Sequence, residues 1–137
     1  MFPRLRPMLS TAPGSFRTVV WLICFAGAFL ATHIPPPKTP LPHAPNDKLL
    51  HFVGFTVLGL LTLWQAAAGR SRLAPRAIVV RYLGLLAYAF LDERTQPLMG
   101  RSYEFGDWLA DAGGAAAAVL IVFMFSTRGR LAEAKGR

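Results

Sequence analysis

Cysteine and acidic residues are both scarce in this chain of 137 residues. Cys24 is the single cysteine, so no internal disulfide can form, and no Cys/His spacing matches a zinc motif. The sequence also contains no internal repeat, no heptad pattern and no nucleotide-binding glycine loop. Only seven residues are Asp or Glu, and six of these lie where apolar segments begin or end. Charges at the margin of hydrocarbon are costly, which makes those positions the first place to look for function.

Hydrophobic residues form 53% of the chain and are concentrated in four blocks, at 18–34, 49–68, 77–91 and 105–125. A helix needs about 20 apolar residues to cross a bilayer core, within a range of roughly 17–25. The first, second and fourth blocks meet this requirement. The third block is short and carries Arg81, so it can span only if Arg81 snorkels to the surface. We predict an all-α fold, a four-helix transmembrane bundle.

The net charge of +8 would suggest nucleic acid in a soluble protein, but here it follows the apolar blocks. Lys and Arg are concentrated before the first block, between the second and third, and after the fourth. Such an excess marks the cytoplasmic side, so we expect both termini to be cytoplasmic and no nucleic-acid partner. The predicted organisation is a flexible cytoplasmic tail at 1–15, the four-helix membrane domain at 16–126, and a basic cytoplasmic tail at 127–137. The first block is expected to be kept as an anchor rather than cleaved as a signal peptide.

A proline-rich loop follows the first block, with six prolines between residues 35 and 45. Such a segment favours extended polyproline II structure, so it should run over the outer face as a stiff connector. We expect His33 and His43, which flank it, to be solvated. Asn46 or Asp47 can then cap the second helix.

Polar residues gather at the predicted outer ends of the last three helices. The members of this polar cluster are Asp47, Lys48, His51, Asp92, Glu93, Gln96, Arg101, Asp107 and Asp111. Steps of three or four residues place several of them on common helix faces, as with Asp107 and Asp111. Two carboxylates at that spacing repel each other unless a proton, a cation or a basic side chain lies between them. Below them, Gly113 and Gly114 begin a small-residue surface that allows close helix packing.

Each member of the polar cluster has a candidate role. Histidine is the side chain that ordinarily titrates near neutrality, so His51 is the candidate general base, with Asp92, Glu93 and Asp107 as further candidate catalytic residues. Candidate substrate-binding residues are Asp47, Lys48, Gln96 and Arg101, of which Lys48 and Arg101 would hold an anionic group. Asp92, Glu93, Asp107 and Asp111 could bind a divalent cation as cofactor. A purely structural reading pairs Asp107 and Asp111 with Arg101 or Lys48, and treats Glu104 as a loop charge.

Two runs resemble the signatures of the VanZ-like (teicoplanin-resistance) membrane proteins. The first is Asp47-Lys48-Leu49-Leu50-His51-Phe52, followed by Phe55 and Leu58. The second is Asp92-Glu93-Arg94-Thr95-Gln96, then Gly100-Arg101, then Asp107, Asp111 and Gly114. The resemblance covers about 47–118 and departs at Asp111, where many members carry Asn. It implies a small multi-pass protein of the bacterial cytoplasmic (inner) membrane, with reduced antibiotic susceptibility in some members and no stated mechanism.

These observations favour an envelope-associated membrane protein whose outer polar site engages a lipid head group, a cell-wall precursor or a cation. Its partners would be membrane lipids and a lipid-linked envelope precursor, and a homo-oligomer remains open. One alternative is a membrane enzyme that acts on a lipid-linked substrate. Another is a structural or assembly protein whose charged cluster is a buried ion network. A transporter is disfavoured for a monomer, because four short helices leave little room for alternating access, whereas an oligomer would provide more.

Overall fold

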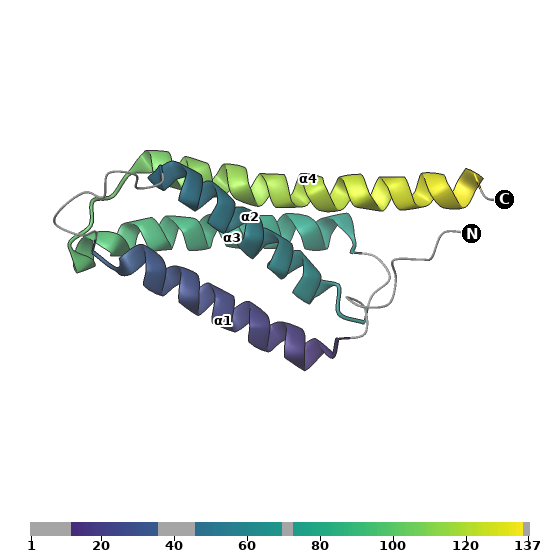
Figure 1. Cartoon of the computed structure of the whole chain (residues 1–137), viewed down its shortest axis with the longest axis horizontal. Coiled ribbons are helices and arrows are strands. Elements are labelled where there is room, and N and C mark those ends of the chain that lie inside the picture. The colour runs from purple at the N-terminus through teal and green to yellow at the C-terminus, as the bar shows by residue number, and fades with distance from the viewer. Residues whose placement is uncertain (1–11, 36–45, 70–72, 136–137) are drawn as a thin grey trace.

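The chain folds as a set of long helices that lie side by side (Figure 1). The computed structural model describes residues 12–35, 46–69 and 73–135, with side chains described as far as residue 125. These ranges contain α1 (Gly14–His33), α2 (Asp47–Ala66), α3 (Pro75–Thr95), the 3-10 helix η1 (Gln96–Met99) and α4 (Phe105–Lys135), and no strand. The predicted all-α class is therefore confirmed. The end of α1, the start of α2, the end of α3 and the start of α4 share one end of the molecule, the polar end (Figure 1).

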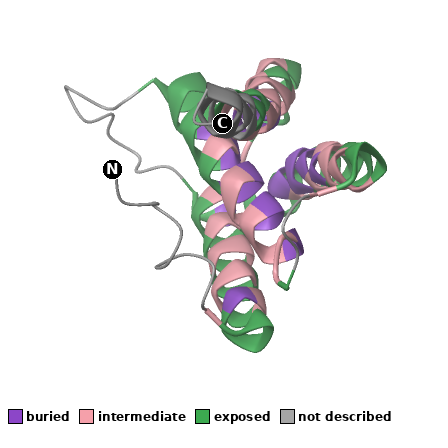
Figure 2. Ribbon diagram, turned by 90° about the vertical axis from the view of Figure 1, so that its right-hand side faces the viewer, coloured by how far each residue is buried: buried purple, intermediate pink, exposed green. Residues whose placement is uncertain are grey.

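Three helices are long and apolar enough to cross a membrane, which indicates a membrane protein. They are α1, α2 and the Phe105–Phe125 part of α4. α3 is not among them, so the fourth span stays a prediction. Figure 2 shows buried positions where helices face one another and exposed positions on their outer sides. Many of those exposed side chains are large and apolar, such as Ile23, Val80 and Phe123, as expected of surfaces that face lipid.

The helix boundaries follow local sequence, with two departures from the predicted tails. The Asn46 side chain accepts a hydrogen bond from the Lys48 backbone N–H at 3.0 Å, so Asn46 rather than Asp47 caps α2. α1 begins at Gly14, two residues inside the predicted 1–15 tail. α4 continues as helix to Lys135, through most of the predicted 127–137 tail. Residues 1–11 and the proline loop at 36–45, with His43, lie outside the described residues.

Small residues bring α2 and α4 into close contact. A Cβ at Gly114 would fall on the carbonyl oxygen of Phe52, and a Cβ at Gly59 would lie 2.6 Å from that of Ala118. Ala115 and Ala118 are 1% and 0% exposed. Only backbones without side chains between them can approach this closely, as is common for membrane helices. We call this contact between α2 and α4 the seam. It sets the distance between the side chains that the two helices carry at the polar end.

α1 contacts the rest of the bundle through polar groups as well as through the core packing of Phe25 and Ala28. Arg17 is buried and donates to the carbonyl oxygen of Trp64 at 2.9 Å, with its guanidinium 5.1 Å from the centre of that ring. The Trp21 indole donates to the Thr62 hydroxyl at 2.9 Å. The positive charge of Arg17, counted above as part of the topology signal, thus lies against the C-terminal turn of α2, where a helix dipole favours a cation.

Candidate functional site

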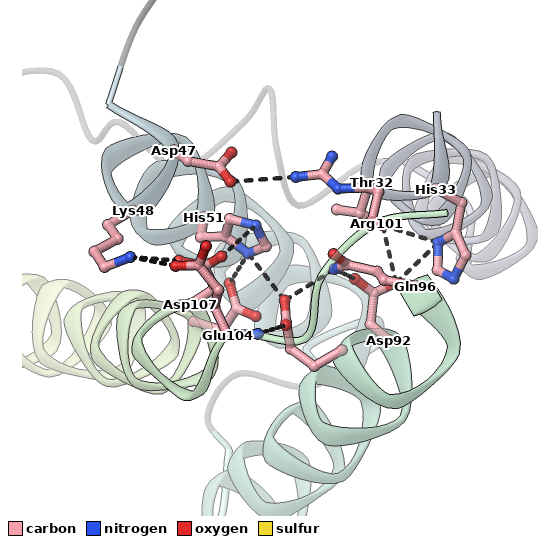
Figure 3. A network of polar contacts seen from close by, with 12 residues as sticks. Thr32, His33, Asp47, Lys48, His51, Asp92, Gln96, Arg101, Glu104 and Asp107 are labelled. Atoms are coloured by element: carbon pink, nitrogen blue, oxygen red, sulfur yellow. Dashed lines mark hydrogen bonds and ion pairs between the residues drawn. The ribbon is translucent and has the colours of Figure 1, made fainter. Parts of the chain in front are cut away.

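A group of buried ionisable side chains lies at the polar end (Figure 3). We call His51, Glu93, Asp107 and Asp111 the acidic centre. Their side chains come from α2, α3 and α4, and none is more than 6% exposed. His51 lies one turn into α2, on the face that continues as the buried Phe55. Three helices therefore meet at one imidazole.

His51 and Asp111 form the tightest contact of the acidic centre. The His51 Nδ1 atom lies 2.9 Å from Asp111 Oδ1 and 3.9 Å from Glu93 Oε1. When Asp111 is ionised its oxygen can only accept, so Nδ1 donates the proton of this bond, and in the neutral imidazole Nε2 then keeps its lone pair. Nε2 lies 3.9 Å from Asp107 Oδ2. The other oxygen of Asp111, Oδ2, is buried with no hydrogen-bond partner among the described residues.

Glu93 is held by groups that can only donate to it. The Gln96 side-chain amide donates to Glu93 Oε1 at 2.9 Å, and the backbone N–H of Glu104 donates to Oε2 at 3.3 Å. The second contact exists because Gly100, at φ +78°, ends η1 in the left-handed conformation and turns the chain toward α4. The same Gln96 amide donates to Asp92 Oδ2 at 3.3 Å, so it joins the acidic centre to its neighbour.

Asp92 belongs to a second group of hydrogen-bonded side chains at the polar end, which we call the second branch. It includes Thr32 and Thr95, which the sequence analysis did not identify as site residues. The Thr32 hydroxyl donates to Asp92 Oδ1 at 3.0 Å, and the Thr95 hydroxyl lies 2.9 Å from His33 Nε2. His33 is 7% exposed, its Nδ1 donates to the carbonyl oxygen of Phe29 at 2.8 Å, and it lies 3.7 Å from Asp92. The expectation that His33 is solvated is wrong, because the end of α1 packs against the end of α3.

The lysine and the arginine of the polar cluster already have acidic partners. Lys48 Nζ lies 3.0 Å from Glu104 and 3.1 Å from Asp107, and Arg101 lies 3.2 Å from Asp47. Lys48 thus pairs with one of the carboxylates proposed for it, whereas Arg101 pairs with neither Asp107 nor Asp111. Glu104, expected to be a loop charge, is half exposed but contacts Lys48.

Negative charge therefore exceeds positive charge inside the polar end. Asp92, Glu93 and Asp111 are at most 1% exposed and have no Lys or Arg partner within the described ranges. The side chains of His33 and His51 are the basic groups that reach them. Burying carboxylates with so little compensation is costly, so a proton or a cation is needed.

Two sets of three ligand atoms lie close enough together to hold a metal ion. His51, Glu93 and Asp111 form one set, and Asp47, His51 and Asp107 form the other, with all ligand atoms in a set within 4.8 Å of one another. All members of the first set are buried, whereas the second already contacts Lys48 and Arg101. Asp92, predicted as a ligand, belongs to neither set.

Comparison with family models, with curated proteins and with solved structures finds no match for this chain.

Proposed function

We propose that this chain is a VanZ-like, multi-pass protein of the bacterial inner membrane, and that its acidic centre binds a divalent cation at the outer face of the cell envelope. The resemblance over 47–118 supports the family, and three apolar helices support the membrane location. The residues of both resembling runs meet at the polar end, which supports a shared role for them. The basic residues near the ends of α1 and α4 support cytoplasmic termini.

The observation that carries the proposal is the free Oδ2 atom of Asp111. It is buried, and it sits in a set that combines one imidazole with two carboxylates. Imidazole and carboxylate together suit divalent transition metals, and carboxylates suit Mg²⁺ and Mn²⁺. A cation there would partner Oδ2 and offset the charges of Glu93 and Asp111. To bind, it would replace the proton on His51 Nδ1, since a ligating nitrogen must be deprotonated.

The same geometry disfavours the anionic ligand expected for Lys48 and Arg101. Both side chains already form ion pairs with acidic residues of the chain. A lipid phosphate would have to displace those carboxylates and would meet further negative charge behind them. The phosphate of a lipid-linked precursor could instead join the site as an additional ligand of the bound cation.

A membrane enzyme acting on a lipid-linked substrate is the second candidate, favoured by the orientation of His51. Its Nδ1 is held by Asp111 at 2.9 Å, which leaves Nε2 free to accept a proton. A histidine oriented by a carboxylate through one nitrogen and free at the other is the arrangement of a general base. The enzyme reading predicts that loss of His51 abolishes activity and leaves the amount of folded protein unchanged.

Thermal unfolding of the purified protein, with a chelator or with Mn²⁺, Zn²⁺ or Mg²⁺, tests the cation proposal. A ligand that binds the native state stabilises it by about 2.7 kcal/mol at 100 times its dissociation constant, so at least one metal should raise the melting temperature. Glu93→Gln should remove this response if the buried set binds the metal, and Asp107→Asn should remove it if the other set does. Glu104→Gln is the matched control, since Glu104 is half exposed and belongs to neither set.

The structural reading makes the opposite forecast for the same variants. If the carboxylates only form an ion network, no metal changes the melting temperature, and Asp107→Asn lowers it without any metal through the loss of the contact with Lys48. A protein that responds neither to metals nor to Glu93→Gln and Asp107→Asn would refute both readings.

A further inference from the structure

A cavity of about 360 Å³ lies between α1, α2 and α3, away from the acidic centre. Its walls include Trp21 and Phe25 of α1, Thr62 of α2, and Arg81, Leu85 and Tyr88 of α3. The volume falls within the range of about 300–1,000 Å³ that is usual for ligand sites. The walls are mainly aromatic and aliphatic, and Arg81 is the one charged residue that lines them.

The other polar side chains that line the cavity already form hydrogen bonds. The Trp21 indole donates to the Thr62 hydroxyl, which in turn donates to the carbonyl oxygen of Leu58 at 2.8 Å. The Tyr88 hydroxyl donates to the carbonyl oxygen of Phe25 at 3.3 Å. By contrast, Arg81 Nε is buried and has no hydrogen-bond partner among the described residues. The cavity wall therefore contains a buried donor without a partner among the described residues, and that donor belongs to a cation.

No acidic side chain of the described residues is near enough to neutralise Arg81. Asp92 lies eleven residues further along α3, about 16 Å at 1.5 Å per residue. The other described acidic side chains also lie at the polar end. A charged group at membrane depth is costly without a partner and commonly marks a binding site.

We infer that this cavity binds an acidic lipid, with its anionic head group on Arg81 and its chain against the aromatic wall. A guanidinium makes strong, charge-assisted hydrogen bonds to carboxylate and phosphate oxygens, which would satisfy the unused Nε. The apolar wall suits a hydrocarbon chain and disfavours a soluble anion. This site is separate from the acidic centre and has the opposite charge preference, so neither proposal depends on the other.

Quenching of tryptophan fluorescence by dibrominated stearate tests the inference on the full chain in phosphatidylcholine nanodiscs. Because Trp21 lines the cavity, wild type should show saturable quenching that Trp21→Phe lacks. Unlabelled stearate should displace the probe, whereas stearyl alcohol, which has the same chain without the charge, should not. Displacement by lysophosphatidate with the same chain measures how a phosphate head group compares with a carboxylate. Inorganic phosphate alone should fail to displace the probe.

Substitution of the arginine provides the decisive comparison. Arg81→Gln removes the charge and should raise the dissociation constant at least tenfold, whereas Arg76→Gln, an exposed position at the start of α3, should leave it unchanged. Arg81→Lys keeps the charge and loses the forked guanidinium, so its affinity should lie between wild type and Arg81→Gln. Equal binding of stearate and stearyl alcohol by wild type would overturn the inference even if Arg81→Gln fails to fold. So would unchanged affinity in Arg81→Gln, which would mean that the guanidinium extends to the membrane surface instead.

Discussion

Adjacent glycines in α4 provide a matched test of the seam between α2 and α4. The two changes are Gly114→Ala and Gly113→Ala, which add the same methyl group one residue apart. At Gly114 the new Cβ would fall on the Phe52 carbonyl oxygen and lie 3.0 Å from the backbone nitrogen of Thr56. These are backbone atoms, which cannot rotate away. At Gly113 the Cβ would lie 3.5 Å from the ring of Phe52, an ordinary contact.

The magnitude follows from two opposing terms. Alanine gains about 0.8–1 kcal/mol over glycine in helix propensity, and this gain is the same at both positions. Inserting a methyl group into a filled site typically costs about 1–3 kcal/mol, a cost that falls on Gly114 alone. The two variants should therefore differ by about 1–3 kcal/mol in free energy of unfolding, with Gly113→Ala as stable as wild type or more so. Gly114→Leu should be worse than Gly114→Ala.

Equilibrium unfolding in mixed micelles of mild detergent and sodium dodecyl sulfate, followed by circular dichroism, measures this difference. A second readout is the melting-temperature response to the divalent cation. Gly114 follows Asp111 by one turn and Phe52 adjoins His51, so a wider seam separates the pair that now lies 2.9 Å apart. Equal stability of Gly114→Ala and Gly113→Ala would refute the close approach of α2 and α4.

Two further predictions concern topology and the second branch. In a Cys24→Ala background, the cysteines of Arg76→Cys and Ser102→Cys should react with a membrane-impermeant thiol reagent from opposite sides of the membrane, Ser102→Cys from outside. Labelling of both from one side would contradict an α3 that spans the membrane. Thr32→Val should lower the free energy of unfolding by about 1.5–3 kcal/mol, the usual contribution of a hydrogen bond to a charged group, because it removes the donor to Asp92. The control is Thr56→Val, which should change stability little because the Thr56 hydroxyl bonds only the Phe52 carbonyl of its own helix.

The helices and the gathering of charge at one end could be predicted because they depend on local patterns. Apolar length gives the helices, and four-residue steps place Asp107 above Asp111 on one face. The place where α4 ends could not be predicted in this way. Hydropathy marks where a helix leaves the apolar layer, whereas α4 continues as helix to Lys135.

The sequence could not predict which side chains contact one another, because this depends on how the helices are rotated and shifted against one another. From the sequence alone, Arg101 could pair equally well with Asp47, Asp107 or Asp111. In the structure it pairs with Asp47. His33 looks like a loop residue beside prolines until α1 is placed against α3. A glycine pair likewise does not reveal which member faces the neighbouring helix.

The polar composition of α3 has a consequence for how the protein enters the membrane. α3 is less apolar than the other three α-helices, and it carries the buried Asp92 and Glu93. Helices that are apolar enough can insert singly and associate afterwards. We expect α3 to remain at the membrane surface until Lys48, His51 and the first turns of α4 are in place to receive it. Removing these polar partners together would then appear in cells as failed insertion and degradation, so activity must be compared per amount of inserted protein.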